Sequence, residues 1–346
     1  MNLIEKLSLS SEDITRKKPY NYKNNDENLF KNEFTKKLPN IFPILNSKSF
    51  IPPCGRLFNK IAFNFYQFNT KITVKELIKS YLKSILFLMK SRKIKRIDYI
   101  LFVTNSNSYN FFHWFLDVLQ KLEFVFESKN EILNSKIKII IPNGHNNSFV
   151  KKSLESFNLD FYFQKKNEII VSNHSILLPD IAPTGNYRKN KILKLAKRLR
   201  NYWTKNEIRI PNYKKIYISR KNSKKRRLIN ESEIIPILKK KGFLILDFDN
   251  LNFEEQLSYT LYSEILVSVH GAGLTHMLWM KKKSKILEIR ARNNYDDNCY
   301  YSLASDLGHD YYYTIADKTH IKKSFHLSDL VINVDEFSTQ LSKMLI

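Results

Sequence analysis

A histidine followed by two closely spaced glycines is the first group of residues in this sequence whose types and spacing suit chemistry. Gly271 and Gly273 come directly after His270, in a chain with only 7 glycines among 346 residues. The apolar run before them predicts a strand, and the residues from Leu274 predict a helix. Such a turn presents backbone N–H groups to an anion, and glycine permits positive φ and close approach of a ligand. The motif therefore predicts a phosphate-binding turn at the carboxyl end of a sheet, where ligands bind in open α/β folds.

Three familiar kinds of nucleotide or metal motif do not fit the residues around this turn. A dinucleotide fingerprint requires glycine at position 276, where this chain has His276. A P-loop requires Gly-Lys-Ser or Gly-Lys-Thr, which the sequence lacks. His270 and His276 are six residues apart, whereas two metal ligands on one helix face are four apart. A glycine turn required only for packing stays open as the alternative.

A basic turn between a strand and a helix is the second candidate. The residues SRKNSKKRRLINESEI begin where a strand ends, at Ser219–Arg220, and a helix begins near Asn230. Arginine suits this place because its planar guanidinium binds two phosphate oxygens at once. A solvated basic loop is the alternative, and for Arg220 by itself both interpretations stay open.

A histidine and an aspartate within an apolar helix form the third candidate. His113 and Asp117 are four residues apart in the segment NFFHWFLDVL, so they share one face of the predicted helix. A pair of this kind near a helix start, at the carboxyl edge of a sheet, suits a general base and its orienting partner. A histidine satisfied inside the core is the alternative.

The segment LDFDN resembles a metal site. Asp247 and Asp249 stand like the Asp-x-Asp pair that holds Mn²⁺ or Mg²⁺ in some transferases. Two acids at the end of a strand are also common for structural reasons, and Asp249 or Asn250 can cap the next helix. We therefore expect no metal at this segment.

An excess of positive charge is the main feature of the composition. The 58 lysines and arginines outnumber the 33 aspartates and glutamates and give a net charge of +25. The lysines are scattered, and Lys239–Lys241 and Lys281–Lys283 look like helix C-terminal turns, where cations complement the helix dipole. No module of clustered basic and aromatic residues is apparent, so we expect no nucleic-acid partner. Peripheral contact with an anionic membrane is an alternative role for the charge.

Cysteine content and hydropathy predict the compartment. The two cysteines, Cys54 and Cys299, lie far apart, which argues against a disulfide scaffold and fits a reducing compartment. The first residues carry early acids and lack the apolar core of a secretory signal. The most apolar helix-like run, Ser84–Met89, is far too short to cross a bilayer. We expect a cytoplasmic protein, with peripheral attachment at the inner face of the membrane as a variant of that location.

Buried strands that alternate with helices predict the fold class. After apolar residues at helical spacing over Val74–Lys90, strands are predicted in 96–105, 136–143, 159–164 and 175–180, with helices over 111–126 and 148–157. A long basic helix near 188–204 follows the break IAPTGNYRKN. Strands in 214–220, 243–249, 264–269 and 284–290 then alternate with helices over 230–242, 252–262, 274–283 and 296–307, and a last helix covers 334–345. This alternation predicts an α/β protein with parallel sheets.

The same pattern predicts three segments. Residues 1–48 are polar, rich in Asn and Lys and weakly periodic, and predict an irregular arm. Residues 49–186 form an N-terminal domain and residues 187–346 a C-terminal domain, each with a doubly wound sheet. We expect the two domains to face each other across a cleft.

Taken together, the motifs resemble those of family 61 glycosyltransferases. The segments NFFHWFLDVL, SRKNSKKRRLINESEI, FEEQLSYTLYSEILVSVHGAGLTHMLW and ILEI carry the resemblance, which covers about residues 95–310. The family includes protein O-linked N-acetylglucosaminyltransferases, plant cell-wall pentosyltransferases and bacterial enzymes of surface polysaccharide assembly. The resemblance implies a GT-B architecture of two Rossmann-like domains, with an acceptor-side N-terminal domain and the nucleotide-sugar donor held mainly by the C-terminal one.

The resemblance also implies roles for particular residues. His113 and Asp117 match the motif of the first domain, and Glu231 is a second candidate carboxylate at the cleft. Two positions depart from the family pattern and concern the contacts beside the phosphate turn: His276 stands where Asn is usual, and Trp279 where Phe is frequent. Glu288 matches an acid that suits a ribose hydroxyl. The implied donor-binding residues are Arg220, Arg226, Asn230, His270, Gly271, Ala272, Gly273, Leu274 and Glu288.

The expected activity is that of an inverting, metal-independent glycosyltransferase without a cofactor. It moves a sugar from a nucleoside diphosphate sugar to a hydroxyl of a glycan or lipid-linked acceptor, in the assembly of capsule, lipopolysaccharide or another surface glycan. The short chain and the absence of a membrane anchor favour the bacterial, cytoplasmic branch. The alternatives are a non-catalytic sugar-nucleotide-binding scaffold of polysaccharide assembly and a basic nucleic-acid-binding protein.

Overall fold

The computed structural model describes residues 3–52, 58–59, 82, 93–105, 107–205, 213–320 and 324–346. The helix expected over Val74–Lys90 lies almost wholly outside these residues, as does Cys54. Two compact units make up the chain: the first combines Met1–Glu12 with Leu38–Thr184, and the second combines Asp13–Lys37 with Gly185–Ile346. The division falls between Thr184 and Gly185, and the sequence prediction placed it between residues 186 and 187.

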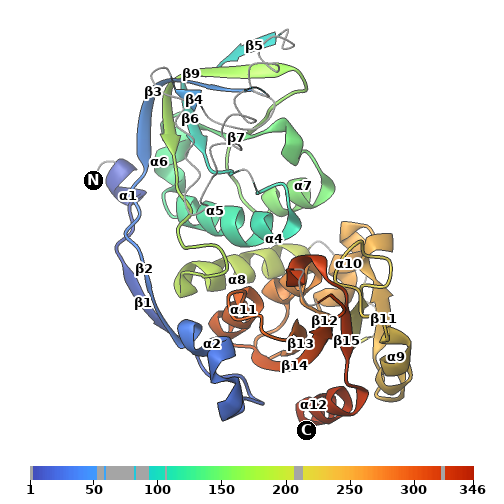
Figure 1. Cartoon of the computed structure of the whole chain (residues 1–346). Coiled ribbons are helices and arrows are strands. Elements are labelled where there is room, and N and C mark those ends of the chain that lie inside the picture. Colours follow the sequence, from blue (N-terminus) through green and yellow to red (C-terminus); the bar gives the residue numbers. More distant parts are fainter. Residues whose placement is uncertain are drawn as a thin grey trace. The chain divides into compact units, whose positions relative to one another are not determined.

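The first unit is built on a mixed sheet in the order β4-β3-β9-β6-β7-β8, with β5 beside β9 (Figure 1). The pairs β9–β6, β6–β7 and β7–β8 are parallel, which confirms the predicted parallel strands, whereas β3 joins antiparallel and was not predicted. The strands are β3 (Ile44–Ile51), β4 (Phe58–Asn59), β5 (Lys93–Arg96), β6 (Tyr99–Phe102), β7 (Lys138–Ile141), β8 (Phe161–Phe163) and β9 (Glu168–Leu177).

The strand order gives the first sheet a topological switch point between β6 and β9. From β6 the chain continues to β7 and β8 on one side, and then returns to β9 on the other side. The carboxyl ends of β6 and β9 therefore lie at the position in the sheet where α/β proteins usually bind ligands. A buried apolar cluster that includes Ile100, Ile140 and Ile170 lies beneath this edge.

One continuous helical segment follows β6, as predicted, but its middle turn is widened. The segment runs through α4 (Phe111–His113), the π-helical turn η2 (Trp114–Val118) and α5 (Leu119–Phe126). π-turns inside helices are rare and occur frequently at functional sites. The unit also contains α1 (Leu3–Lys6), α6 (Lys129–Asn134), η3 (Asn143–His145) and α7 (Ser148–Leu154).

The second unit is built on a sheet in the order β11-β10-β12-β13-β14-β15, parallel except for the last pair. Every strand predicted in this half is present, and β14 and β15 are additional. Because β10 leads outward to β11 while β12 leads to β13, the switch point lies between β10 and β12. The strands are β10 (Lys215–Ser219), β11 (Leu244–Asp247), β12 (Ile265–Val269), β13 (Lys285–Ala291), β14 (Asp310–Lys318) and β15 (Leu330–Ile332).

Helices cover both faces of this second sheet. Residues of α9 and α12 pack in one buried cluster with inward-facing residues of the strands, while α8, α11 and η5 pack together. Gly242 ends α9 with a φ of 79°, as predicted for a helix stop. The helical elements are α8 (Lys189–Lys205), α9 (Glu231–Lys240), η4 (Phe248–Asn250), α10 (Phe253–Thr260), η5 (Ala272–Trp279), α11 (Cys299–Leu307), η6 (Phe325–Leu327) and α12 (Val334–Leu345).

The N-terminal segment differs from the irregular arm expected over residues 1–48. It forms β1 (Glu12–Thr15), η1 (Asn24–Asp26), α2 (Glu27–Phe34) and β2 (Thr35–Leu38), and residues 13–37 pack in the second unit. The buried Arg16 guanidinium pairs with Asp306 at 2.9 Å and with Glu33 at 3.2 Å. The backbone N–H of Tyr20 donates to the carbonyl of Tyr311 on β14. Sequence periodicity missed the segment because its apolar contacts come from a few residues, such as Leu29 and Phe30 on one short helix, and a buried ion pair and backbone hydrogen bonds complete its attachment.

Candidate functional site

The glycines after β12 are required for steric reasons. Neither Gly271 nor Gly273 has a φ in the left-handed region, so the positive φ that glycine permits is not used here. A Cβ added to Gly271 would lie 2.6 Å from Nη1 of Arg220, and one added to Gly273 would lie 3.2 Å from Cγ2 of Ile218. Gly271 thus leaves room for a guanidinium over the turn, and Gly273 lets the turn pack on β10.

The helix that follows the turn is a 3₁₀-helix, not the α-helix that the sequence predicted. It begins at Ala272, and the N–H of Leu274 donates to the carbonyl of Gly271 at 2.9 Å. The Leu274 N–H is therefore used inside the turn. The N–H groups of Ala272 and Gly273, in the first turn, have no partner within the helix and suit an anion.

Arg220 and Arg226 come together beside the turn, as the basic motif predicted. Arg220 Nε donates to the carbonyl of Arg226 at 3.3 Å, and Arg220 Nη2 donates to the carbonyl of Lys225 at 2.9 Å. Burial and then the Arg226 charge lower the pKa of Arg220. Arg226 has a φ of 56°, and its Nε is buried without a hydrogen-bond partner. Within the described part of the chain, neither guanidinium lies within 4.0 Å of a carboxylate oxygen, so their charge is left for another anion.

His270 lies inside a network of carboxylates. Its Nδ1 pairs with Glu288 at 2.5 Å and its Nε2 with Asp297 at 3.1 Å, and the ring is buried. Burial lowers the pKa of His270, but the two carboxylates outweigh burial and raise it. Glu288 also accepts from Tyr311 at 2.6 Å. With both ring nitrogens engaged, His270 does not face an open phosphate site, and Glu288, at 0% exposure, does not reach a ribose.

The side chains of Asn230 and Glu231 are both engaged in hydrogen bonds within the second unit. The Asn230 side chain donates to the carbonyl of Ile332 at 2.9 Å and accepts from its N–H at 3.1 Å, so it fastens β15 to the start of α9. Glu231 accepts from Tyr217 at 2.6 Å and from Ser219 at 2.8 Å.

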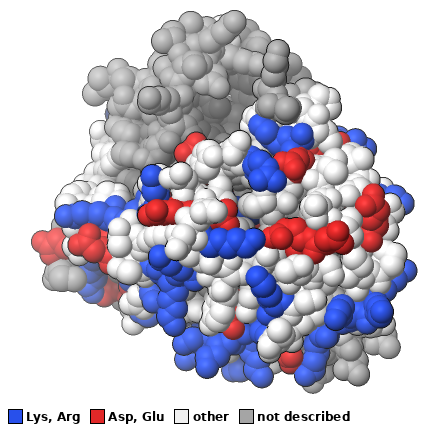
Figure 2. Space-filling view, turned by 60° about the horizontal axis from the view of Figure 1, so that its bottom comes forward, with Lys and Arg blue, Asp and Glu red and all other residues white. Residues whose placement is uncertain are grey.

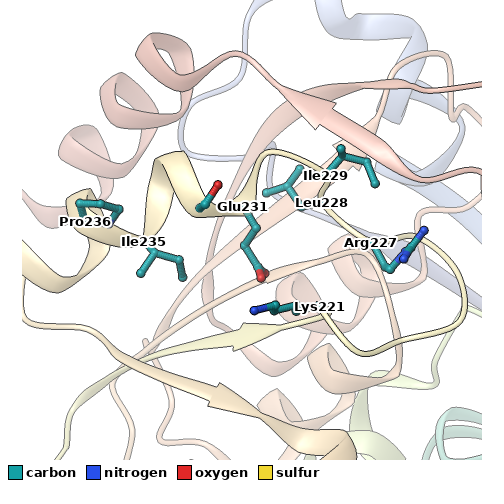
Figure 3. Close-up of a pocket in the computed structure, with 8 residues that line it drawn as sticks. Lys221, Arg227, Leu228, Ile229, Glu231, Ile235 and Pro236 are labelled. Atoms are coloured by element: carbon teal, nitrogen blue, oxygen red, sulfur yellow. The ribbon is translucent and has the colours of Figure 1, made fainter.

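A pocket of about 460 Å³ lies beside Glu231 (Figure 3). It opens between α9 and the loop that carries the two arginines. Both apolar and polar side chains line it. Its volume is within the usual range for small-molecule sites. It is lined by Lys221, Arg227, Leu228, Ile229, Glu231, Ser232, Ile235 and Pro236.

The Asp-x-Asp segment serves the local fold. Asp247 caps η4 by accepting from the N–H of Asp249, and Asp249 accepts from Ser223 at 2.9 Å. Neither Asp249 nor Asn250 caps α10; Asn252 does so in a capping box. His276 faces Phe248 and Trp279 in the core, and burial lowers its pKa to about 3. The departures at positions 276 and 279 are therefore changes in packing.

The His113–Asp117 pair exists as the sequence predicted. Nδ1 of His113 and Oδ2 of Asp117 are 2.7 Å apart, with 23% of the His113 side chain exposed and 4% of the Asp117 side chain. Burial raises the pKa of Asp117, while the hydrogen bond from His113 lowers it. Because Nδ1 is held, Nε2 is the nitrogen available to another group. The pair lies next to the switch point of the first sheet.

The charged groups around this pair were not predicted from the sequence. Lys121 and Asp180 form a buried ion pair at 2.6 Å, and Asn105 donates to the same carboxylate at 3.2 Å. Thr184 donates to Asp117 at 3.3 Å. Asn105 follows β6 and Asp180 follows β9, so both stand at the switch point. The acid that ends the segment SILLPD, directly after its buried residues, was the signal that could have indicated Asp180.

Positive charge is dispersed over the surface shown in Figure 2, where acidic and uncharged side chains separate the lysines and arginines. Several lysines are paired, for example Lys214 with Glu264 at 2.9 Å and Lys23 with Glu336 at 3.0 Å. This distribution supports the view that much of the charge is solvated lysine. Within the described part of the chain, no helix combines the length and apolar character that crossing a membrane requires.

One match to known proteins covers candidate site residues of both units. A family model described as Glycosyltransferase 61 matches residues 111–287, slightly more than half of the chain. This range contains every predicted site residue except Glu288.

Curated relatives match a shorter stretch. The EGF domain-specific O-linked N-acetylglucosamine transferase of Drosophila melanogaster is 37% identical over 91 residues, 25% of this chain and 17% of that protein. The protein of the same name from Gallus gallus is 36% identical over 84 residues, 23% of this chain and 15% of that protein. The chain thus spans about a sixth of the length of the curated relatives it matches.

Proposed function

Because the chain belongs to the glycosyltransferase 61 family, we propose that it transfers a sugar from a nucleoside diphosphate sugar to an acceptor hydroxyl with inversion at the anomeric carbon. The observation that carries this proposal is a pair of arginines without carboxylate partners among the described residues: Arg220 lies beside Gly271, and Arg226 lies beside Arg220. A diphosphate is the anion that such a site, at a switch point between parallel strands, fits best.

The second unit holds the donor in this proposal. The diphosphate lies against the first N–H groups of the turn, Ala272 and Gly273, and both guanidiniums neutralise the charge that grows as the sugar leaves. Each preorganised donor of this kind is worth about 10²–10³ in rate. His270 and Glu288 do not contact the donor in this proposal. Their pairing holds the end of β12 in place.

We assign the nucleoside part of the donor to the pocket beside Glu231. The pocket and the arginines share one loop, since Lys221 and Arg227 line the pocket and Arg220 and Arg226 precede them directly in the chain. Apolar walls with a few polar groups suit a base and a ribose.

The first unit supplies the general base. Asp117 holds Nδ1 of His113 and so presents Nε2 to the acceptor hydroxyl. His113 takes the proton as the hydroxyl attacks the anomeric carbon from the face opposite the diphosphate. The GT-B arrangement implied by the resemblance, with an acceptor-side first unit and a donor-side second unit, is part of this proposal.

The remaining features of the proposal concern the metal, the acceptor and the location. The arginines take the place of a divalent cation at the diphosphate, so Mg²⁺ and Mn²⁺ are dispensable. The acceptor is a glycan or lipid-linked glycan in surface polysaccharide assembly on the cytoplasmic side of a membrane. The EGF domain in the relatives' name is not carried over, because the matched stretch covers about a sixth of their length.

A thermal-shift panel of nucleoside diphosphates and nucleotide sugars tests the proposal. A ligand present at 100 times its Kd stabilises the protein by about 2.7 kcal/mol, which moves the unfolding midpoint by several degrees. We expect at least one nucleoside diphosphate to do so, and the matching nucleoside without phosphates to do much less. A panel without a shift for any diphosphate would overturn the assignment.

A further inference from the structure

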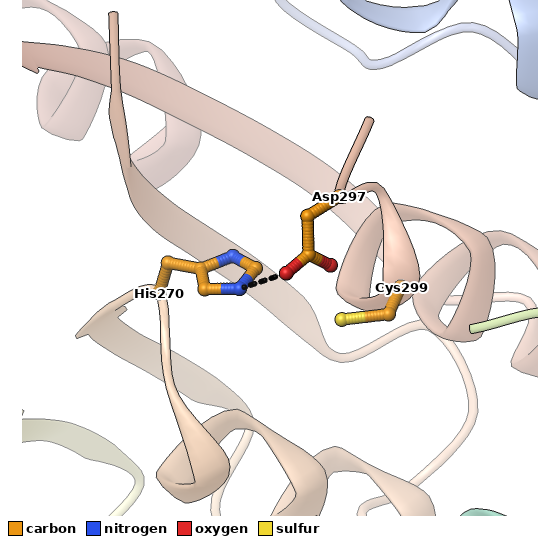
Figure 4. A group of neighbouring side chains, drawn as sticks. All are labelled: His270, Asp297 and Cys299. Carbon is orange, nitrogen blue, oxygen red and sulfur yellow. Dashed lines mark hydrogen bonds and ion pairs between the residues drawn. The ribbon is translucent and has the colours of Figure 1, made fainter. Parts of the chain in front are cut away.

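Three potential metal ligands meet next to the phosphate turn (Figure 4). His270 ends β12, Asp297 precedes α11, and Cys299 is the first residue of α11. One ligand atom from each of these residues lies within 4.8 Å of the other two. In Figure 4 the three side chains point toward a common space, and Nε2 of His270 is joined to Asp297.

The other nitrogen of His270 is already held as in a metal-binding histidine. Metal-bound histidines almost always give their second ring N–H to a carboxylate, which fixes the tautomer and the ring orientation. Here the Glu288 carboxylate pairs with Nδ1 of His270 at 2.5 Å. Tyr311 donates to Glu288 at 2.6 Å, and Arg290 pairs with it at 3.6 Å. The arrangement leaves Nε2 as the nitrogen that faces Asp297 and Cys299.

The surroundings limit the entry of water. Cys299 is 8% exposed and His270 3% exposed. The rings of Tyr300 and Phe325 lie edge-on to the imidazole, with centroid separations of 4.9 Å and 5.4 Å. The side of the cluster formed by His270 and Cys299 is therefore shielded from water by aromatic rings, whereas the Asp297 side chain is 25% exposed.

We propose that His270, Asp297 and Cys299 bind a structural zinc ion. A set of imidazole, thiolate and carboxylate selects zinc over Mg²⁺ or Mn²⁺, which prefer oxygen ligands only. Tetrahedral zinc, with bonds of about 2.0–2.3 Å, separates its ligand atoms by roughly 3.3–3.8 Å, so the present spacing needs shifts on the order of 1 Å. Binding releases the thiol proton and any proton on Nε2 to solvent.

His326 is the fourth ligand in this proposal. Its Nε2 lies 3.9 Å from the same Asp297 oxygen, and its ring is partly exposed on η6. The ion would then connect the end of β12, the start of α11 and η6. It would fix the backbone of the phosphate turn from below without touching the reacting atoms, and this role does not depend on the proposed transferase activity.

Metal analysis and cobalt substitution test the site. The full-length protein, reconstituted with zinc and dialysed against metal-free buffer, is expected to retain one equivalent by mass spectrometry. Cobalt reconstitution is expected to give a near-ultraviolet thiolate-to-Co²⁺ absorption band. Because the chain has 2 cysteines, Cys299→Ser should abolish the band and Cys54→Ser should leave it.

A second variant guards against a folding defect. Glu288→Gln, which keeps the shape of the side chain, should weaken zinc binding by about 10–100-fold and leave the ligands in place. Circular dichroism identifies variants that are folded. Folded wild-type protein that neither retains zinc nor shows the cobalt band would overturn the proposal, as would a band that persists in Cys299→Ser.

Discussion

The switch points of the two sheets differ in how their charges are paired. In the first unit, His113 is paired with Asp117 and Lys121 with Asp180, and the two carboxylates are nearly buried. In the second unit, Arg220 and Arg226 stand together without a carboxylate within 4.0 Å among the described residues. Charge that lacks an internal partner is costly unless a ligand supplies one.

The two histidines at these places show the same contrast. His113 uses one nitrogen for a carboxylate and keeps 23% of its side chain exposed. His270 uses both nitrogens and is buried. A histidine must have a free nitrogen and access to solvent or substrate to accept a proton, so only His113 suits a general base. Within the proposed mechanism, this contrast favours proton transfer by the first unit and anion binding by the second.

Removal of the base should produce the largest effect and separate the two assignments. His113→Ala is expected to lower turnover by about 10²–10⁴-fold, because general-base catalysis contributes that much. Binding of nucleoside diphosphate, measured by thermal shift, should be unchanged. His174→Ala, at an exposed histidine of the same unit, is the matched control. If His113→Ala loses binding and turnover alike, the division of labour between the units is wrong.

Removal of an arginine should produce the complementary result. Arg226→Ala is expected to weaken nucleoside diphosphate binding by roughly 10–100-fold, since a hydrogen bond to a charged group contributes about 1.5–3 kcal/mol. Isothermal titration measures the change. Lys224→Ala, an exposed cation in the same loop, should alter affinity less than about threefold when salt is at about 0.15 M. Equal losses in both variants would mean that only the general positive charge of the loop matters.

The two glycines of the turn sharpen the contrast within the second unit. Gly271→Ala should displace Arg220 and weaken diphosphate binding to a similar extent as Arg220→Ala, with little change in unfolding temperature. Gly273→Ala should press on Ile218 and cost about 1 kcal/mol of stability, as overpacking does, while binding persists. Calorimetry measures the stability of both variants, and isothermal titration measures their binding of nucleoside diphosphate. The reverse pattern would contradict the roles given to the two glycines.

The α/β class and the parallel sheets could be predicted because buried strands and amphipathic helices have regular apolar periods. His113–Asp117 and Arg220–Arg226 were also accessible, since each pair lies within a few residues of sequence. The partners of His270 were not accessible in this way. Asp297 and Glu288 come from different elements, and only the parallel register of β12 with β13 brings Glu288 beside His270.

The errors have the same origin. Glycine was expected to permit positive φ and the close approach of a ligand, but the group that approaches Gly271 is the side chain of Arg220, a tertiary contact that periodicity does not encode. The apolar residues of the segment 1–48 are few and lie on short elements, and the buried Arg16 that helps to anchor it pairs with Asp306, 290 residues away. Local pattern therefore predicted which elements form, whereas long-range polar contacts decided which side chains serve structure and which remain available for a ligand.

The smallest effect concerns buried neutral histidines, of which the described residues include His145 in the first unit and His276 and His309 in the second. Burial lowers their pKa from 6.5 to about 4, about 3 and about 4 respectively. Below pH 6.5 the unfolded chain therefore binds protons that the folded chain does not, so stability falls as pH falls, by about 1.4 kcal/mol per pH unit for each histidine. The second unit has two such histidines and also His326 with a lowered pKa, so it should lose more than the first between about pH 6.5 and 5.5, while the raised pKa of His270 offsets part of that loss. Hydrogen exchange resolved by peptide measures both losses, and His309→Gln should reduce the loss in the second unit only. Equal losses in the two units, unchanged by that variant, would show that other groups control the response to acid.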